Sequence, residues 1–191
     1  MLFRSELALV EIAPDQSSAL ATAADSGEAL LVVPGPAGFR VTGLAGVAAG
    51  ASRIVYSPSG KAAALWFSST GHVQVVKGLP AAPSARDTDA SFFGGDPGAL
   101  AVSDDGAWVM GAWAGQVYAL GPDSAVKAVA VNGAAQALCF FHGSLNAAVI
   151  TANEVVTISD IGGGATPKTI WSKPEDAGQE ASAQTAVGLA V

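Results

Sequence analysis

Charged side chains, imidazoles and thiols are scarce in this sequence. Only 13% of its 191 residues are charged, and it holds two histidines and one cysteine. A globular protein normally has about 25% charged residues. With so few imidazole and thiol groups, a zinc site built from several His and Cys ligands is not expected. Cys139 has no partner for an internal disulfide, and its Leu-Cys-Phe-Phe setting predicts a buried, unreactive side chain.

Long apolar runs and basic clusters are also missing. No stretch of about 18 apolar residues is free of Gly, Pro or charge, so no transmembrane helix is predicted. The first residues, MLFRSELALVEIAP, lack the apolar core and cleavage site of a signal peptide. Sixteen acidic residues against nine basic ones give a net charge of −7. We therefore expect a soluble, acidic protein with no nucleic-acid or membrane partner, and the compartment stays undetermined.

The hydrophobic half of the chain is organised in internal repeats. Residues 12–32 align without a gap on residues 56–76, an offset of 44. Residues 100–120 align in the same way on residues 138–158, an offset of 38. Ser-Pro-Ser-Gly and Ser-Asp-Asp-Gly segments link the second and third units, which makes four units of propeller-blade length. Their approximate bounds are residues 6–47, 53–95, 99–132 and 136–173.

Each unit shows the pattern of a β-meander. Short apolar or alternating runs, such as HVQVV, QVYAL and EVVTI, are separated by polar turns. Gly60 and Gly115 suit turn positions with positive φ, and Asn153, aligned with Gly115, is the best substitute for glycine there. The segments FRVTGL, VKAVAV and TPKTIW are candidates for a fourth strand. Four antiparallel strands per unit are therefore expected.

The turn segments resemble the β-propeller blade of YVTN, TolB-like and tryptophan-aspartate repeat proteins. In these families a strand runs into Ser-Pro-Asp-Gly, and a second strand follows. Ser57-Pro58-Ser59-Gly60 and Ser103-Asp104-Asp105-Gly106 look like that element, whereas Gln16 and Ser144 stand where the first and fourth units would have the glycine. The resemblance implies an all-β, β-propeller-like fold of about four blades, each a four-stranded antiparallel meander.

Closure of the propeller has three alternatives. Residues 185–191, TAVGLAV, look like the first strand of a fifth blade. The chain is then part of a larger propeller with missing further blades, a four-bladed ring sealed by this strand, or one half of a self-associated assembly. Propellers have about 4 to 8 blades, and an incomplete ring exposes apolar blade faces. We favour the incomplete ring, alone or self-associated.

A cation site is the first chemical candidate. Asp87, Asp89 and Asp96 lie in a long connection over residues 78–98, and carboxylate oxygens are ligands for Ca²⁺. Their spacing does not match the D-x-[DN]-x-[DN]-G loop, which favours a solvated loop instead. No metal and no cofactor is therefore predicted.

Other reactive side chains have structural explanations. Two histidines are few for an acid–base site. Ser57 and Ser103 lack the G-x-S-x-G setting of a hydrolase nucleophile. Neighbouring acids before a glycine suit a tight turn, and the triple glycine at residues 162–164 is not followed by the Lys of a phosphate loop. No catalytic residue is therefore assigned; the residues considered were His72, His142, Ser57, Ser103, Asp104 and Asp105.

Aromatic residues are expected to stabilise the blades. Bulky side chains stack propeller sheets, so blade packing is favoured over a ligand cage for Trp66, Phe67, Trp108, Trp113 and Trp171. In the long connection, Phe92 and Phe93 are candidates for a partner-contact loop. The favoured alternative is an outer strand followed by an ordinary loop, with the Phe pair packed beneath it.

Three functions remain open at this point. The preferred one is a non-catalytic interaction module that presents loops to a protein or glycan partner. The second is part of a propeller enzyme, a hydrolase or lactonase, with acidic and His side chains meeting near the ring axis. The third is a purely structural repeat unit. The enzyme hypothesis predicts polar convergence at the axis, and the interaction hypothesis predicts an apolar or aromatic surface.

Overall fold

The computed structural model describes residues 7–23, 29–48, 50–93 and 95–174 as four antiparallel sheets of four strands. The first sheet contains β1 (Leu7–Ile12), β2 (Ala19–Ala23), β3 (Ala29–Gly35) and β4 (Gly38–Gly43). The second contains β5 (Arg53–Tyr56), β6 (Ala62–Phe67), β7 (His72–Lys77) and β8 (Ser84–Asp89), followed by a 3-10 turn, η1 (Ser91–Phe93). The third contains β9 (Ala99–Val102), β10 (Val109–Trp113), β11 (Gln116–Leu120) and β12 (Val126–Ala130). The fourth contains β13 (Ala135–Phe140), β14 (Ala147–Thr151), β15 (Glu154–Ser159) and β16 (Thr166–Ser172).

The predicted all-β fold of four-stranded meanders is confirmed. In each sheet the strands are hydrogen-bonded in chain order, and all pairs are antiparallel. The three candidate fourth strands fall in β4, β12 and β16. In the second sheet the fourth strand, β8, comes from the long connection, so Asp87 and Asp89 belong to a strand and the prediction of a solvated loop for them was wrong.

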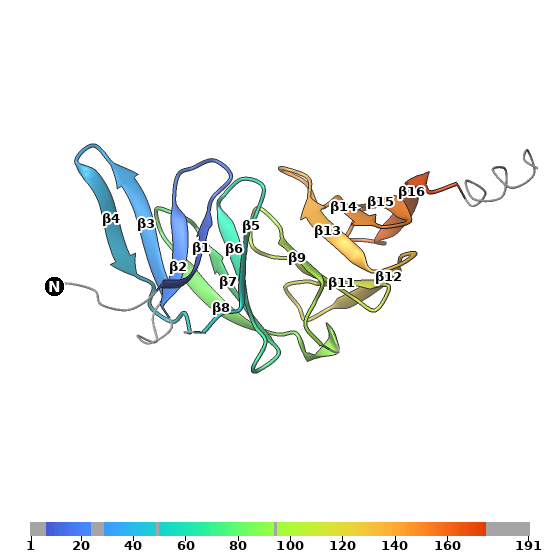
Figure 1. The fold of residues 1–191 in the computed structure, drawn as a ribbon, viewed down its shortest axis with the longest axis horizontal. Helices are drawn as coiled ribbons and strands as arrows, with labels where there is room; N and C mark the ends of the chain where they lie inside the picture. The colour runs from blue at the N-terminus through green and yellow to red at the C-terminus, as the bar shows by residue number, and fades with distance from the viewer. Residues whose placement is uncertain (1–6, 24–28, 49, 94, 175–191) are drawn as a thin grey trace, which may run out of the picture.

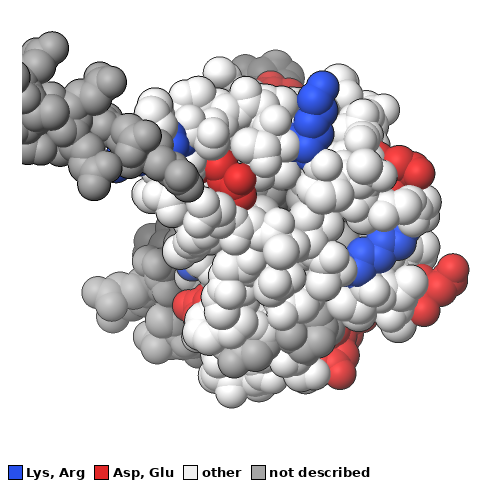
Figure 2. All heavy atoms as spheres, turned by 90° about the vertical axis from the view of Figure 1, so that its right-hand side faces the viewer, with Lys and Arg blue, Asp and Glu red and all other residues white. Residues whose placement is uncertain are grey.

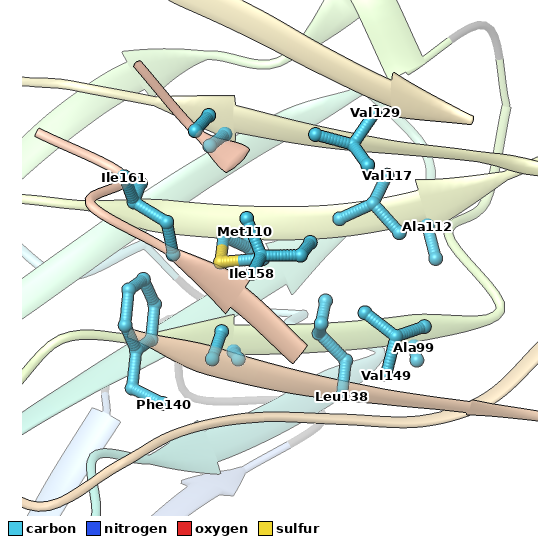
Figure 3. Packing of buried hydrophobic residues seen from close by; sticks show 14 of the residues in the cluster. Ala99, Met110, Ala112, Val117, Val129, Leu138, Phe140, Val149, Ile158 and Ile161 are labelled. Carbon is cyan, nitrogen blue, oxygen red and sulfur yellow. The ribbon is translucent and has the colours of Figure 1, made fainter. Parts of the chain in front are cut away.

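The sheets stack face to face through three apolar cores. One core joins the first and second sheets, one joins the second and third, and the largest joins the third and fourth. In the last of these, Met110 and Val117 of the third sheet face Phe140 and Ile158 of the fourth (Figure 3). We call the face that a sheet turns toward the preceding sheet its leading face, and the opposite face its trailing face. Each junction therefore pairs a trailing face with a leading face.

The Ser-x-x-Gly turns after β5 and β9 have a common geometry. The Ser57 hydroxyl, which is fully buried, accepts a hydrogen bond from the Ala62 N–H at 3.1 Å. Gly60, at φ +71°, closes the turn by donating its N–H to the Ser57 carbonyl at 3.0 Å. In the first sheet, Gln16 stands at the position of Gly60 and also adopts a positive φ, +58°. In the fourth sheet, the residue with positive φ is Gly143 rather than Ser144. The departures from the motif are thus accommodated in two different ways.

The four sheets form an open series. Figure 1 shows the first sheet at one end and the fourth at the other, with the second and third between them. Within the described residues, no apolar core joins the first sheet to the fourth. The C-terminal TAVGLAV segment lies outside the described residues. In the part of the chain that the structure describes, no helix has the length and apolar character needed to cross a membrane.

Candidate functional site: the axial cavity

The first strands of the four sheets line an open cavity, which we call the axial cavity. β5 contacts β1 on one side and β9 on the other, and β9 also contacts β13. The cavity measures about 400 Å³ and extends to the turns after β1 and β5, where Pro14 and Pro58 line it. All four sheets contribute to its lining, with Ile12, Val55, Leu100 and Leu138 among the lining residues. Ligand pockets in proteins are typically concave, mostly apolar and about 300–1,000 Å³ in volume.

Apolar side chains dominate the lining of the axial cavity. Among the described residues that line it, Glu11 carries the only charge. Tyr56 adds a phenol, whose oxygen lies 3.4 Å from the Ser18 hydroxyl. Burial raises the pKa of Tyr56 to about 12, so the phenol stays protonated at neutral pH and acts as a hydrogen-bonding group. The cavity is chemically suited to an apolar ligand segment with one polar or basic neighbour.

Cys139 also lines the axial cavity and is exposed. The expectation that this side chain is buried was wrong. Its neighbours Leu138 and Phe140 point into the core between the third and fourth sheets, where they are 9% and 3% exposed. Because side chains alternate along a strand, Cys139 points to the trailing face of the fourth sheet, which no described residue covers.

A carboxylate joins three of the turns beside the cavity. Asp104, in the turn after β9, accepts a hydrogen bond from the Ser59 N–H of the second sheet at 2.7 Å. Its other oxygen accepts one from the Gly143 N–H of the fourth sheet, also at 2.7 Å. His142 Nδ1 lies 3.3 Å from the same oxygen, on a side chain that is 74% exposed. One side chain thereby fixes the second, third and fourth sheets relative to one another.

The protonation of Asp104 reflects this position. Partial burial works to raise the pKa of its carboxyl group, but the Gly143 N–H, the hydrogen bonds from Ser59 and the nearby His142 imidazole together outweigh burial. The pKa therefore lies below its ordinary value, and the carboxylate is charged at neutral pH. Asp104 is held as an anion by backbone donors, which is the environment of a structural linker rather than of a general acid.

The three acidic residues considered for a cation have other partners. Asp87 accepts a hydrogen bond from the Gln74 amide at 2.7 Å, and Asp89 accepts one from the Ser91 N–H at 2.9 Å. Asp96 lies 3.8 Å from the Arg53 guanidinium. Over the described residues, no group of three or more His, Cys, Asp or Glu side chains is arranged to hold a metal ion.

The remaining reactive candidates lie apart from one another. His72 is exposed at the start of β7, where Asp89 is its partner across the strand pair. Ser103 is buried and donates its hydroxyl to Asp105 at 2.6 Å while accepting the Trp108 N–H at 2.9 Å. In the turn at residues 162–164, the Asp160 carboxylate accepts the N–H groups of the second and third glycines. These groups serve turns and strand ends, not a shared site.

The aromatic residues divide into two groups. Trp66, Phe67 and Trp108 are buried within the stack of sheets. Phe93 is fully buried as well, with its ring centroid 6.0 Å from that of Trp66, so a partner cannot reach it. The side chain of Phe92 lies outside the described residues. Trp113 and Trp171, by contrast, are 40% and 50% exposed.

Sequence reasoning missed two features of the site. It did not find the axial cavity, because the lining residues belong to strands up to 130 positions apart and only the stack of sheets brings them together. It assigned Asp104 to turn formation and missed its link to Ser59 and Gly143. A signal was present, since the third unit has an acidic residue at a turn position where the first two units have Pro14 and Pro58.

Solved structures show what this arrangement is similar to, although neither a protein-family model nor a curated protein sequence matches the chain. A functionally unknown protein from Desulfotomaculum acetoxidans superimposes with a TM-score of 0.55 at 19% identity, over 90% of this chain and 57% of that one. The β-propeller domain of Cps50 (Swd1) from Myceliophteria thermophila gives 0.54 at 10% identity, over 90% and 55%. The periplasmic gluconolactonase of Pseudomonas aeruginosa gives 0.50 at 16% identity, over 88% and 54%. The fold is that of a partial β-propeller, and the chain spans little more than half the length of these proteins.

Proposed function

We propose that this chain is a non-catalytic β-propeller interaction module that binds an apolar segment of a partner protein in the axial cavity. The observation that carries the proposal is the lining of that cavity, which is apolar, draws on all four sheets and contains Glu11 as its only described charge. A peptide fits this chemistry better than a glycan, because a glycan needs many hydrogen-bonding groups along its binding surface. Glu11 favours a basic residue beside the apolar anchor.

Two alternatives have less support. A propeller hydrolase or lactonase needs an acid–base pair or several ligands at the axis. The described lining offers Glu11, the exposed Cys139 thiol and the Tyr56 phenol, which a pKa of about 12 keeps protonated at neutral pH, and it contains no histidine. A purely structural unit needs no apolar binding surface, yet apolar residues of all four sheets line an open cavity of about 400 Å³. The chain covers 57% and 54% of two of its structural neighbours, so an enzyme site of this kind would draw on blades in addition to the four described.

A fluorophore on the single cysteine tests the proposal directly. Peptides are selected from a random phage-displayed library on the immobilised chain, and their binding is followed with an environment-sensitive dye on Cys139, which lines the cavity. We expect selected peptides to carry an apolar anchor and to shift the dye emission. Glu11→Arg, at an exposed position, should weaken peptides that contain a neighbouring Lys or Arg several-fold.

The matched control moves the dye to the other end of the sheets. In Cys139→Ser/Ser69→Cys, the dye sits on the exposed turn between β6 and β7, at the far end of the second sheet from the cavity. Peptides bound in the cavity should leave this emission unchanged. Equal shifts at both positions, or selected peptides that never affect the Cys139 dye, would overturn the proposal.

A further inference from the structure

The first and fourth sheets each present one face that no described residue covers. On the leading face of the first sheet, Val10, Ile12 and Val41 are 49%, 64% and 48% exposed. The strand register places Ala19, Ala21, Leu30 and Val32 beside them on the same face. No charged or polar side chain interrupts these rows. A cavity of about 330 Å³ lies on this face, lined by Ile12, Val32, Phe39 and neighbouring residues.

The trailing face of the fourth sheet is similar. Its central row is Ala137, Ile150, Val155 and Trp171, which face the same way in the strand register. Ile150 and Trp171 are 43% and 50% exposed. The next row contains Cys139, Ala148, Thr157 and one charged residue, Lys168. Seen from the side of the β13–β16 end, uncharged surface predominates, with scattered charged side chains (Figure 2).

The repeat shows what such faces contact. At the offset of 44, Val10 corresponds to Ile54, which is 4% exposed because the leading face of the second sheet is packed against the first. At the offset of 38, Ile150 corresponds to Ala112, which is 3% exposed because the trailing face of the third sheet is packed against the fourth. The open positions are therefore those that every internal junction buries. An open leading face fits the trailing face of another sheet.

We propose that two copies of this chain close into a ring of eight sheets. The trailing face of the fourth sheet in one copy stacks on the leading face of the first sheet in the other, and a twofold axis repeats the junction. Each copy has one face of each kind, so two identical junctions cover all four faces and leave none for further growth. Large uncovered apolar faces are typical of association sites. The ring would also complete the axial cavity, which is open between β1 and β13 in a single copy.

One substitution on each face tests the arrangement. By light scattering coupled to gel filtration, the 191-residue chain should have about twice the monomer mass of 18.8 kDa. Val41→Lys on the leading face and Ile150→Glu on the trailing face should each give a monomer. The control Thr42→Lys, at an exposed position on the opposite face of β4, should remain a dimer. Because Val41 and Ile150 are exposed in a single copy, the monomeric variants should remain folded, with the β-sheet circular dichroism spectrum of the wild type.

Mixing the two variants identifies the pairing of faces. An equimolar mixture of Val41→Lys and Ile150→Glu chains retains one intact junction, so a two-chain species should reappear. In the other junction, the leading face with Val41→Lys meets the trailing face with Ile150→Glu. Phe39→Lys provides a second test of the leading face, since Phe39 is 76% exposed. An interface formed by two copies of the same face would respond to only one of the single variants and would show no such complementation.

Several outcomes would overturn the two-copy ring. They are a wild-type monomer at all accessible concentrations, dimers of Val41→Lys or Ile150→Glu, loss of the dimer in Thr42→Lys, or a ladder of longer open assemblies. Because Cys139 lies on the trailing face itself, mass and peptide binding are compared on unlabelled chains, with binding followed by titration calorimetry. A wild-type monomer that binds the selected peptides would refute the ring and leave the proposed function intact. A dimer of the predicted kind that binds none of them would do the reverse.

Discussion

The leading faces of the first and second sheets carry equivalent residues but differ in exposure. Val10 and Ile54 occupy the same position of the repeat, yet their side chains are 49% and 4% exposed. Ile12 is 64% exposed, whereas its counterpart Tyr56 is partly buried against the first sheet. The difference comes from the neighbouring sheet and not from the strand itself. A blade therefore has the residues for two junctions even where the described chain supplies only one.

Most of the stability of the stack should come from the junctions between neighbouring sheets. Each internal junction buries aliphatic and aromatic side chains, and burial contributes about 25 cal/mol per Å² of apolar surface. In a repeat architecture, stability is approximately the sum of the units and of the interfaces between neighbours. Removing a buried group from an internal junction should thus cost far more than the equivalent change on an open face.

The largest expected effect is the loss of Ile54. Ile54→Ala should lower the free energy of unfolding by about 2–5 kcal/mol, because it leaves a cavity between the first and second sheets. The equivalent change on the open face, Val10→Ala, should cost less than about 0.5 kcal/mol in the monomer, as for an exposed position. Urea unfolding followed by tryptophan fluorescence measures both, in the Val41→Lys background to keep the chain monomeric. Similar losses for the two variants would show that the first sheet is covered in solution.

The sequence predicted local structure well where one strand or turn determines it. The four meanders, their fourth strands and the Ser-x-x-Gly turns follow from alternation and from turn residues such as Gly60. Cys139 was wrongly predicted to be buried because the hydrophobic run LCFF masks the alternation of the strand. Leu138 and Phe140 face the third sheet, so Cys139 faces the uncovered side. Which face of a strand is covered depends on the stack, and no local pattern contains that information.

Two aligned hairpins show the same limit at a turn. Between β10 and β11, Ala114 and Gly115 adopt φ of +49° and +77°. Asn153 was expected to take the place of Gly115, but it is not among the described residues with positive φ. Instead the Thr151 hydroxyl accepts the N–H groups of Asn153 and Glu154, at 3.1 and 3.0 Å, and closes the turn. The hydrogen bonds of the Thr151 hydroxyl therefore close this turn without the positive φ that the alignment predicted at Asn153.

A smaller effect is expected at the turns that join the sheets. Asp104→Asn should lower the free energy of unfolding by about 1–2 kcal/mol, because the amide can accept from Ser59 or Gly143 but turns its NH₂ toward the other N–H. Asp105→Asn is the matched control. Asp105 receives the Ser103 hydroxyl and the Ala107 N–H on a single oxygen, which asparagine retains. Equal losses in the two variants, measured by urea unfolding, would contradict a linking role for Asp104.

The pH dependence of that difference should give the smallest effect. The pKa of Asp104 is lowered in the folded chain, so its contribution is fully present above the unfolded value of about 3.9 and is lost as the pH falls through the lower folded value. The gap in unfolding free energy between wild type and Asp104→Asn should narrow as the pH falls below about 4. Other carboxyl groups titrate in both proteins and their effects largely cancel, so a gap that fails to narrow in this range would mean that Asp104 is not held as an anion by its donors.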